Sequence, residues 1–165
     1  MRIGVDIGGT NLVAGLVDDK FNLVDKVGTP ANGSRSDREI IDDIIMLCKK
    51  LMSQNNLEVS DIEAIGLGVP GCFDNDNGVI VFCENINFLN TPVGEWIRRE
   101  IDVPVYLGND ADCAALGEAY AGATKDAAHS VMVTIGTGIG VGAILDNKII
   151  NGVNHSEMGH IALRK

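Results

Sequence analysis

Two glycine-rich turns carry the residues of this chain that are best suited to bind phosphate. The first turn contains Gly8, Gly9, Thr10 and Asn11, and it follows an apolar strand that passes through Asp6. Adjacent glycines let backbone N–H groups approach an anionic oxygen without interference from a Cβ atom, Thr10 adds a hydroxyl donor, and Asp6 can hold a hydrated Mg²⁺. The same glycines could instead serve only a tight β-hairpin.

The second turn repeats this design far downstream. It contains Gly136, Thr137 and Gly138, with Gly140 in the strand that follows. Neither turn is a Walker A loop, because no Gly-Lys-Ser/Thr follows, and both lead into strands, whereas a dinucleotide-binding fingerprint opens a helix. We therefore expect two lobes that each offer a backbone clamp to one polyphosphate, with the phosphates in the cleft between them.

Composition favours a cytoplasmic enzyme. The chain has 165 residues, 45% of them hydrophobic, and its formal net charge is −10, which argues against broad contact with nucleic acids or anionic membranes. Strand-like sequence at Arg2 leaves no place for a signal peptide, and no apolar run approaches membrane-spanning length. Four scattered cysteines form neither a disulfide framework nor a zinc knuckle, which fits a reducing compartment.

The elements that must position the turns follow an α/β alternation. A helix is predicted to begin with a capping box at Ser36 and Glu39 and to bury an apolar stripe formed by Ile40, Ile41, Ile44, Ile45, Leu47, Cys48, Leu51 and Met52. Turns are expected at 70–71 and 74–78. The other expected elements are strands at 21–27, 64–69, 79–82 and 103–107 and helices at 92–100 and 109–121. Almost wholly apolar strands near 131–135 and 140–145 predict a sheet whose covering helices lie later in the chain.

Asp110 is the main candidate for acid–base chemistry. It stands between the strand at 103–107 and the alanine-rich helix at 109–121, where open α/β sheets present reactive groups. The dipole of that helix favours an ionised carboxylate, which suits a general base. The other interpretation of Asp110 is a helix N-cap or first-turn acid.

Five separated motifs together resemble the ROK family of bacterial sugar kinases and repressors, and most closely its glucokinase branch. They are Asp6-Ile7-Gly8-Gly9-Thr10-Asn11, Gly68-Val69-Pro70-Gly71, Gly108-Asn109-Asp110-Ala111 with Ala115-Leu116-Gly117-Glu118, Thr134-Ile135-Gly136-Thr137-Gly138-Ile139-Gly140, and Glu157-Met158-Gly159-His160. The resemblance covers nearly the whole chain. It implies the actin-like, ribonuclease H-like ATPase fold: an α/β lobe over 1–118 with a mixed sheet flanked by helices, and the incomplete start of a second lobe over 119–165.

The resemblance also implies an activity, the ATP-dependent phosphorylation of a hexose, with glucose as the expected sugar, its 6-hydroxyl as the acceptor and Mg²⁺ as the metal. Asp110 would be the catalytic base. The implied sugar ligands are Gly71, Asn85, Asn109, Asp110, Glu157 and His160. The implied phosphate contacts are Gly8, Gly9, Thr10, Asn11, Gly136, Thr137, Gly138 and Gly140, with Asp6 holding Mg²⁺ through water.

Departures from the family pattern limit what the resemblance implies. Asn154-His155-Ser156 precedes Glu157 where the family has Ala-Gly, which leaves the choice of sugar open. His160 resembles a zinc ligand whose three partner cysteines are not in this sequence, so Zn²⁺ is expected only in a full-length form. The sequence ends at Lys165, and we expect it to be the inactive N-terminal part of a longer, homo-oligomeric kinase of glycolysis.

Two other functions remain open. One is a sugar-sensing transcriptional regulator of the ROK type, although Asp6 leaves no room for a helix-turn-helix ahead of the first strand. The other is a non-catalytic module that binds a sugar or a phosphate. The presence of Asp110 favours the kinase.

Overall fold

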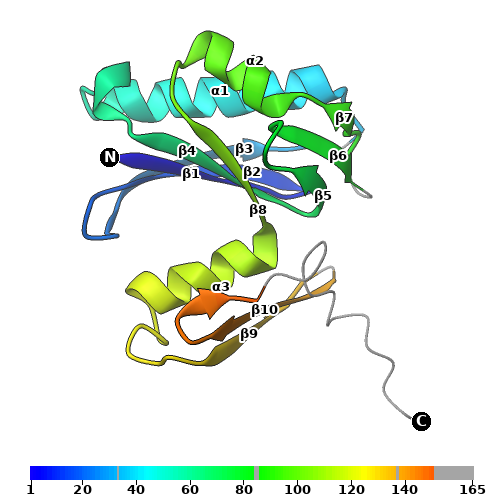
Figure 1. The fold of residues 1–165 in the computed structure, drawn as a ribbon. Helices are drawn as coiled ribbons and strands as arrows, with labels where there is room; N and C mark the ends of the chain where they lie inside the picture. The colour runs from blue at the N-terminus through cyan, green and yellow to red at the C-terminus, as the bar shows by residue number, and fades with distance from the viewer. Residues whose placement is uncertain (33, 84–85, 137, 151–165) are drawn as a thin grey trace. The chain divides into compact units, whose positions relative to one another are not determined.

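The computed structural model describes residues 1–150, except residues 33, 84–85 and 137 (Figure 1). Contacts divide the chain into two compact units, residues 1–108 and 109–165. The first helix of the second unit, α3 (Asp110–Ala121), is thereby grouped with the strands that follow it. The lobe boundary expected from the sequence after residue 118 stays a prediction for the complete protein.

The first unit contains the mixed sheet that the family resemblance implies. Its five strands follow the order β3 (Leu23–Pro30), β2 (Asn11–Val17), β1 (Arg2–Ile7), β4 (Ala64–Val69) and β8 (Val105–Asn109). β1 pairs with β2 antiparallel and with β4 parallel. One face of β1 and β2 is buried through alternate apolar side chains, namely Ile3, Val5, Ile7, Leu12, Ala14 and Leu16.

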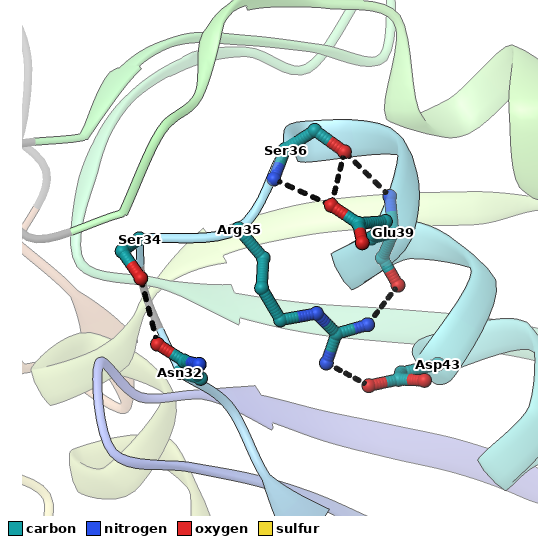
Figure 2. A network of polar contacts seen from close by, with 6 residues as sticks. All are labelled: Asn32, Ser34, Arg35, Ser36, Glu39 and Asp43. Atoms are coloured by element: carbon teal, nitrogen blue, oxygen red, sulfur yellow. Dashed lines mark hydrogen bonds and ion pairs between the residues drawn. The ribbon is translucent and has the colours of Figure 1, made fainter.

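Helix α1 (Asp37–Gln54) begins and packs as the sequence predicts. Figure 2 shows its capping box: the Glu39 amide donates to Ser36 Oγ at 3.3 Å, and the Ser36 amide donates to Glu39 Oε2 at 3.0 Å. Arg35 braces this first turn, since Nη1 lies 2.7 Å from Asp43 Oδ2 and Nη2 donates to the Glu39 carbonyl at 3.0 Å. All eight residues of the predicted apolar stripe are buried. Figure 1 shows α1 and α2 (Val93–Glu100) along the same face of the sheet.

A second, antiparallel sheet in the first unit was only partly predicted. It consists of β5 (Gly71–Asp74), β6 (Val79–Cys83) and β7 (Leu89–Thr91). Residue 71, expected in a turn, instead begins β5, and β7 was missed. β5 and β7 are both short, and they are recognised as strands because each pairs with β6. A short 3₁₀ helix, η1 (Val59–Asp61), precedes β4.

Two strands begin two residues later than predicted, because the residues before them form turns. The expected strand at 21–27 is β3, which begins later because Phe21 has a positive φ of 62° in a turn held by Asp18. The expected strand at 103–107 is β8, and Val103 before it donates its amide to the Ile101 carbonyl at 2.8 Å. No helix in the described part of the chain is long and apolar enough to span a bilayer.

The second unit packs α3 against the sheet β11 (Lys148–Ile149), β10 (Ile139–Leu145) and β9 (Ser130–Ile135). A Cβ atom at Gly142 would lie 2.6 Å from both the Ala111 carbonyl oxygen and Ala115 Cβ, so β10 and α3 touch where both carry small residues. The expectation that the covering helices lie only later in the chain was therefore wrong for one face. The other face exposes Val131, Val133 and Ile135.

Candidate functional site

The first glycine-rich turn is held by its carbonyl groups. Gly8 donates its amide to the Asn11 carbonyl at 3.0 Å, and the Thr10 carbonyl accepts from the Ala31 amide at 2.8 Å. Gly9 and Thr10 are exposed, and neither their amides nor the Thr10 hydroxyl has an acceptor among the residues that the structure describes. Backbone and hydroxyl donors that point at no protein acceptor can bind an anion.

Asp6 lies on the exposed face of the sheet, in register with Val13 of β2 and Gly68 of β4. In the neighbouring cross-strand row three glycines lie side by side, because Gly4 pairs with both Gly15 and Gly66. A Cβ atom at Gly4 or Gly66 would meet no heavy atom within 4 Å. This glycine row was missed from the sequence, since only strand register aligns the three residues. It leaves open space on the face that carries the Asp6 carboxylate.

Asn109 and Asp110 form the start of α3. Asn109 is the N-cap, and its Oδ1 accepts from the Asp112 amide at 3.1 Å. Asp110 is the first helical residue, so the first-turn interpretation of it is confirmed. Its side chain is exposed: Oδ1 accepts from the Ala111 amide at 2.8 Å, while Oδ2 has no donor among the described residues. Oδ2 is therefore the carboxylate oxygen that a ligand could approach.

Gly71 has a packing role that the sequence did not reveal. It pairs with Cys83 across β5 and β6. A Cβ atom there would collide with the Phe82 carbonyl oxygen and lie 2.8 Å from Cys83 Sγ. Its predicted contact with a sugar stays a prediction.

The glycines of the second turn differ in the space around them. Gly136 donates its amide to the Gly138 carbonyl at 2.9 Å, and a Cβ atom at either glycine would meet nothing within 4 Å. Gly140, by contrast, lies against α3, where a Cβ atom would be 2.5 Å from Thr134 Oγ1 and 2.9 Å from Ala111 Cβ. Open space at the tip is compatible with a ligand, whereas Gly140 already has a structural reason to be glycine.

Four predicted site residues lie outside the described part of the chain, namely Asn85, Thr137, Glu157 and His160. Within the described part, no group of three or more histidine, cysteine or acidic side chains could hold a metal ion. None of the four cysteines, all in the described part of the chain, forms a disulfide bond, and burial raises the pKa of Cys48 to about 12. The zinc site expected for a full-length form thus stays a prediction.

The sequence placed Asn75 only in a polar turn, yet its side chain contacts Leu107 of β8, the strand that precedes Asp110. The sequence shows an asparagine in a short hairpin, but Leu107, which this asparagine contacts, lies 32 residues further along the chain. No local pattern could have paired them.

Known proteins similar to this chain are sugar kinases and repressors. Residues 2–165 match the ROK family. A glucokinase of Halalkalibacterium halodurans is 35% identical over 163 residues, which cover 98% of this chain and 49% of that protein. A putative xylose repressor of a Caldicellulosiruptor species is 25% identical, and the match covers 98% of this chain and 41% of that repressor.

A crystal structure of a ROK family glucokinase from Streptomyces griseus, in complex with glucose and AMPPNP, superposes with a TM-score of 0.86. It is 30% identical in sequence, and the match covers 99% of this chain and 51% of that one. The chain therefore spans about half the length of the curated relatives it matches.

Proposed function

Because this chain belongs to the ROK family, whose matched relatives include several sugar kinases, we propose that the complete protein transfers a phosphoryl group from ATP to a hexose. The observation that carries the proposal is the exposed carboxylate of Asp110 at the N-terminus of α3. The structure of the Streptomyces griseus glucokinase with glucose supports glucose as the hexose. The 6-hydroxyl as the acceptor is what the resemblance to the glucokinase branch implies.

In this proposal Asp110 is the general base. Its available oxygen, Oδ2, accepts the proton of the sugar hydroxyl while that hydroxyl oxygen forms a bond to the γ-phosphorus of ATP. The bond between the γ-phosphorus and the departing oxygen of ADP breaks in the same step, so charge and atoms balance. Assistance by a general base contributes about 10²–10⁴-fold to the rate.

The first turn is proposed as the phosphate contact. The amides of Gly9 and Thr10 and the Thr10 hydroxyl supply donors that no described residue uses. Asp6, on the exposed face with open space beside it, fits a hydrated Mg²⁺, which would neutralise phosphate charge when bound. Gly136 and Gly138, where a Cβ atom would meet nothing within 4 Å, are proposed as a second phosphate contact.

A transcriptional regulator is the second candidate, because the chain also resembles a putative xylose repressor. The two candidates differ in what they require of Asp110, since a sugar sensor has no proton to remove. The acidic net charge of −10 also favours the kinase over a protein that contacts DNA through this region.

The test is the Asp110→Asn substitution in the complete protein that contains these residues. We expect turnover with Mg-ATP and glucose to fall by orders of magnitude, while glucose affinity stays within about tenfold, since the amide keeps the shape but cannot accept the proton. Turnover is measured by a coupled ADP assay and affinity by calorimetry. A variant that keeps more than about a tenth of wild-type turnover would show that Asp110 is not the base.

The same assay applied to the isolated 165-residue chain should show no sugar-dependent ADP release. The matched kinases are about twice as long, so half of such a protein is not represented in these residues. Turnover by the isolated chain that disappears on Asp110→Asn would contradict this expectation.

A further inference from the structure

The side chain of Asn75 holds the outer edge of β8. Its Nδ2 donates to the Leu107 carbonyl at 2.6 Å, and its Oδ1 accepts from the Leu107 amide at 2.9 Å. β8 is the last strand of its sheet, and on its inner side the Pro104 carbonyl accepts from the Ile65 amide of β4 at 2.9 Å. At Leu107 the Asn75 amide therefore satisfies the backbone groups that a further strand would otherwise pair.

The turn that carries Asn75 is itself fixed on both sides. The Asn77 amide and side chain donate to the two Asp74 carboxylate oxygens at 3.1 and 2.7 Å, and these bonds hold the pKa of Asp74 below its ordinary value. Gly78, with a φ of +66°, accepts from the Gly94 amide of α2 at 2.9 Å. Asn75 is thus presented to β8 from a turn with little freedom to move.

The primary amide of Asn75 supplies both groups that this contact uses. Leu107 offers one N–H and one carbonyl, so the clamp needs an acceptor and a donor side by side. Aspartate at position 75 would keep the acceptor but place a carboxylate oxygen against the Leu107 carbonyl, and alanine would supply neither group. Leaving partly buried backbone groups without partners makes the strand end less stable.

We propose that Asn75 is a positioning residue for Asp110 in the phosphoryl transfer proposed above, on which this inference rests. Leu107 precedes Asp110 by three residues, in the strand that leads directly into α3. Fixing Leu107 fixes the point at which the chain enters the helix that carries the base. A small displacement of a catalytic group is costly, because the reacting atoms must lie within a narrow range of distance and angle.

The experiment compares Asn75→Ala and Asn75→Asp with Asn55→Ala in the complete protein. Asn55 is the matched control, because its Nδ2 also donates to a backbone carbonyl, that of Leu51, at 2.9 Å in the same unit. We expect both Asn75 variants to lower kcat by about tenfold or more with the glucose KM within about threefold. Asn55→Ala should leave kcat within about twofold even if it lowers Tm as much.

Amide hydrogen exchange gives a second measurement that does not depend on activity. Exchange at Leu107 and at the helix start, Ala111 and Asp112, should accelerate about tenfold or more in the Asn75 variants and not in Asn55→Ala. Unchanged exchange, or an unchanged kcat, would overturn the positioning role. If the wild-type protein phosphorylates no hexose, the proposed function fails, while exchange still decides whether Asn75 fixes the strand before Asp110.

Discussion

The two glycine-rich hairpins have similar sequences but different structural support. β1 of the first hairpin is central in a five-stranded sheet, and its inward side chains Ile3, Val5 and Ile7 are at most 3% exposed. β9 of the second hairpin is an edge strand of a three-stranded sheet, and Ile135 beside the turn is 83% exposed. The first turn follows a strand whose inward side chains are buried in the core. The second turn follows a strand whose apolar side chains are exposed on one face of its sheet.

Their glycines differ as well. Gly8 and Gly9 lie at the tip of the first hairpin, beside amides with no acceptor among the described residues. Gly140 and Gly142 lie within β10 and allow close contact with Ala111 and Ala115 of α3. Glycine therefore allows helix packing along β10, whereas at the first tip we propose that it allows a phosphate to approach. Substitutions can separate the two.

The largest effect is expected at the first tip. Gly9→Val in the complete protein should abolish ATP-dependent turnover with little change in sugar binding, because a branched side chain would occupy the space of a phosphate oxygen. Calorimetry with ATP and with glucose measures the two affinities.

The control for this substitution is Gly117→Ala, at a glycine of α3 with no proposed ligand, where a Cβ atom meets nothing within 4 Å. It should leave both affinities unchanged. Circular dichroism must show that both variants fold. Wild-type ATP affinity in the Gly9 variant would mean that the glycines serve only the turn.

An intermediate effect is expected in β10. Gly142→Ala should destabilise the second unit by about 1–3 kcal/mol, because the new methyl group must displace backbone and alanine atoms that cannot rotate away. Gly136→Ala, which meets nothing within 4 Å, should change stability by less than about 0.5 kcal/mol.

Urea unfolding of the 165-residue chain can follow the two units separately. Trp96, the only tryptophan of the sequence, lies on α2 and reports on the first unit, while circular dichroism reports on both. The Gly142 variant should shift a transition seen by circular dichroism and leave the Trp96 transition in place. Equal stability of the two glycine variants would remove the packing explanation.

The smallest effect concerns the exposed apolar side chains of β9. We expect the isolated chain to self-associate weakly through Val131, Val133 and Ile135, since an exposed apolar sheet favours pairing with another chain. Ile135→Lys should lower the sedimentation coefficient of concentrated samples. Leu89→Lys, at an apolar residue 71% exposed on β7 of the first unit, should not. A wild-type chain that is monomeric at high concentration would contradict this expectation.

Local sequence was sufficient wherever a single element decides the outcome. The capping box at Ser36 and the buried stripe of α1 depend on residues three and four apart, so periodicity and capping predicted them correctly. The paired strands around each glycine-rich turn were also predicted from local sequence, because an apolar strand precedes and follows each turn. The position of Asp110 at a helix start could likewise be read from the chain, whereas the capping role of Asn109 was not foreseen.

Contacts between distant segments could not be predicted in this way. β5 and β7 are too short to show a period of their own, and their pairing with β6 establishes them. The glycine row beside Asp6 exists because register brings Gly4, Gly15 and Gly66 together. The clamp of Asn75 on Leu107 joins a hairpin turn to an edge strand.

The sequence alone thus determined the family, the α/β elements and the residue types that could bind phosphate or take a proton. The tertiary structure decided which glycines leave space and which are filled by a neighbour, and which backbone groups already have partners. The physical reason is that propensity, periodicity and capping act over a few residues, whereas steric space and hydrogen-bond saturation depend on segments that only folding brings together.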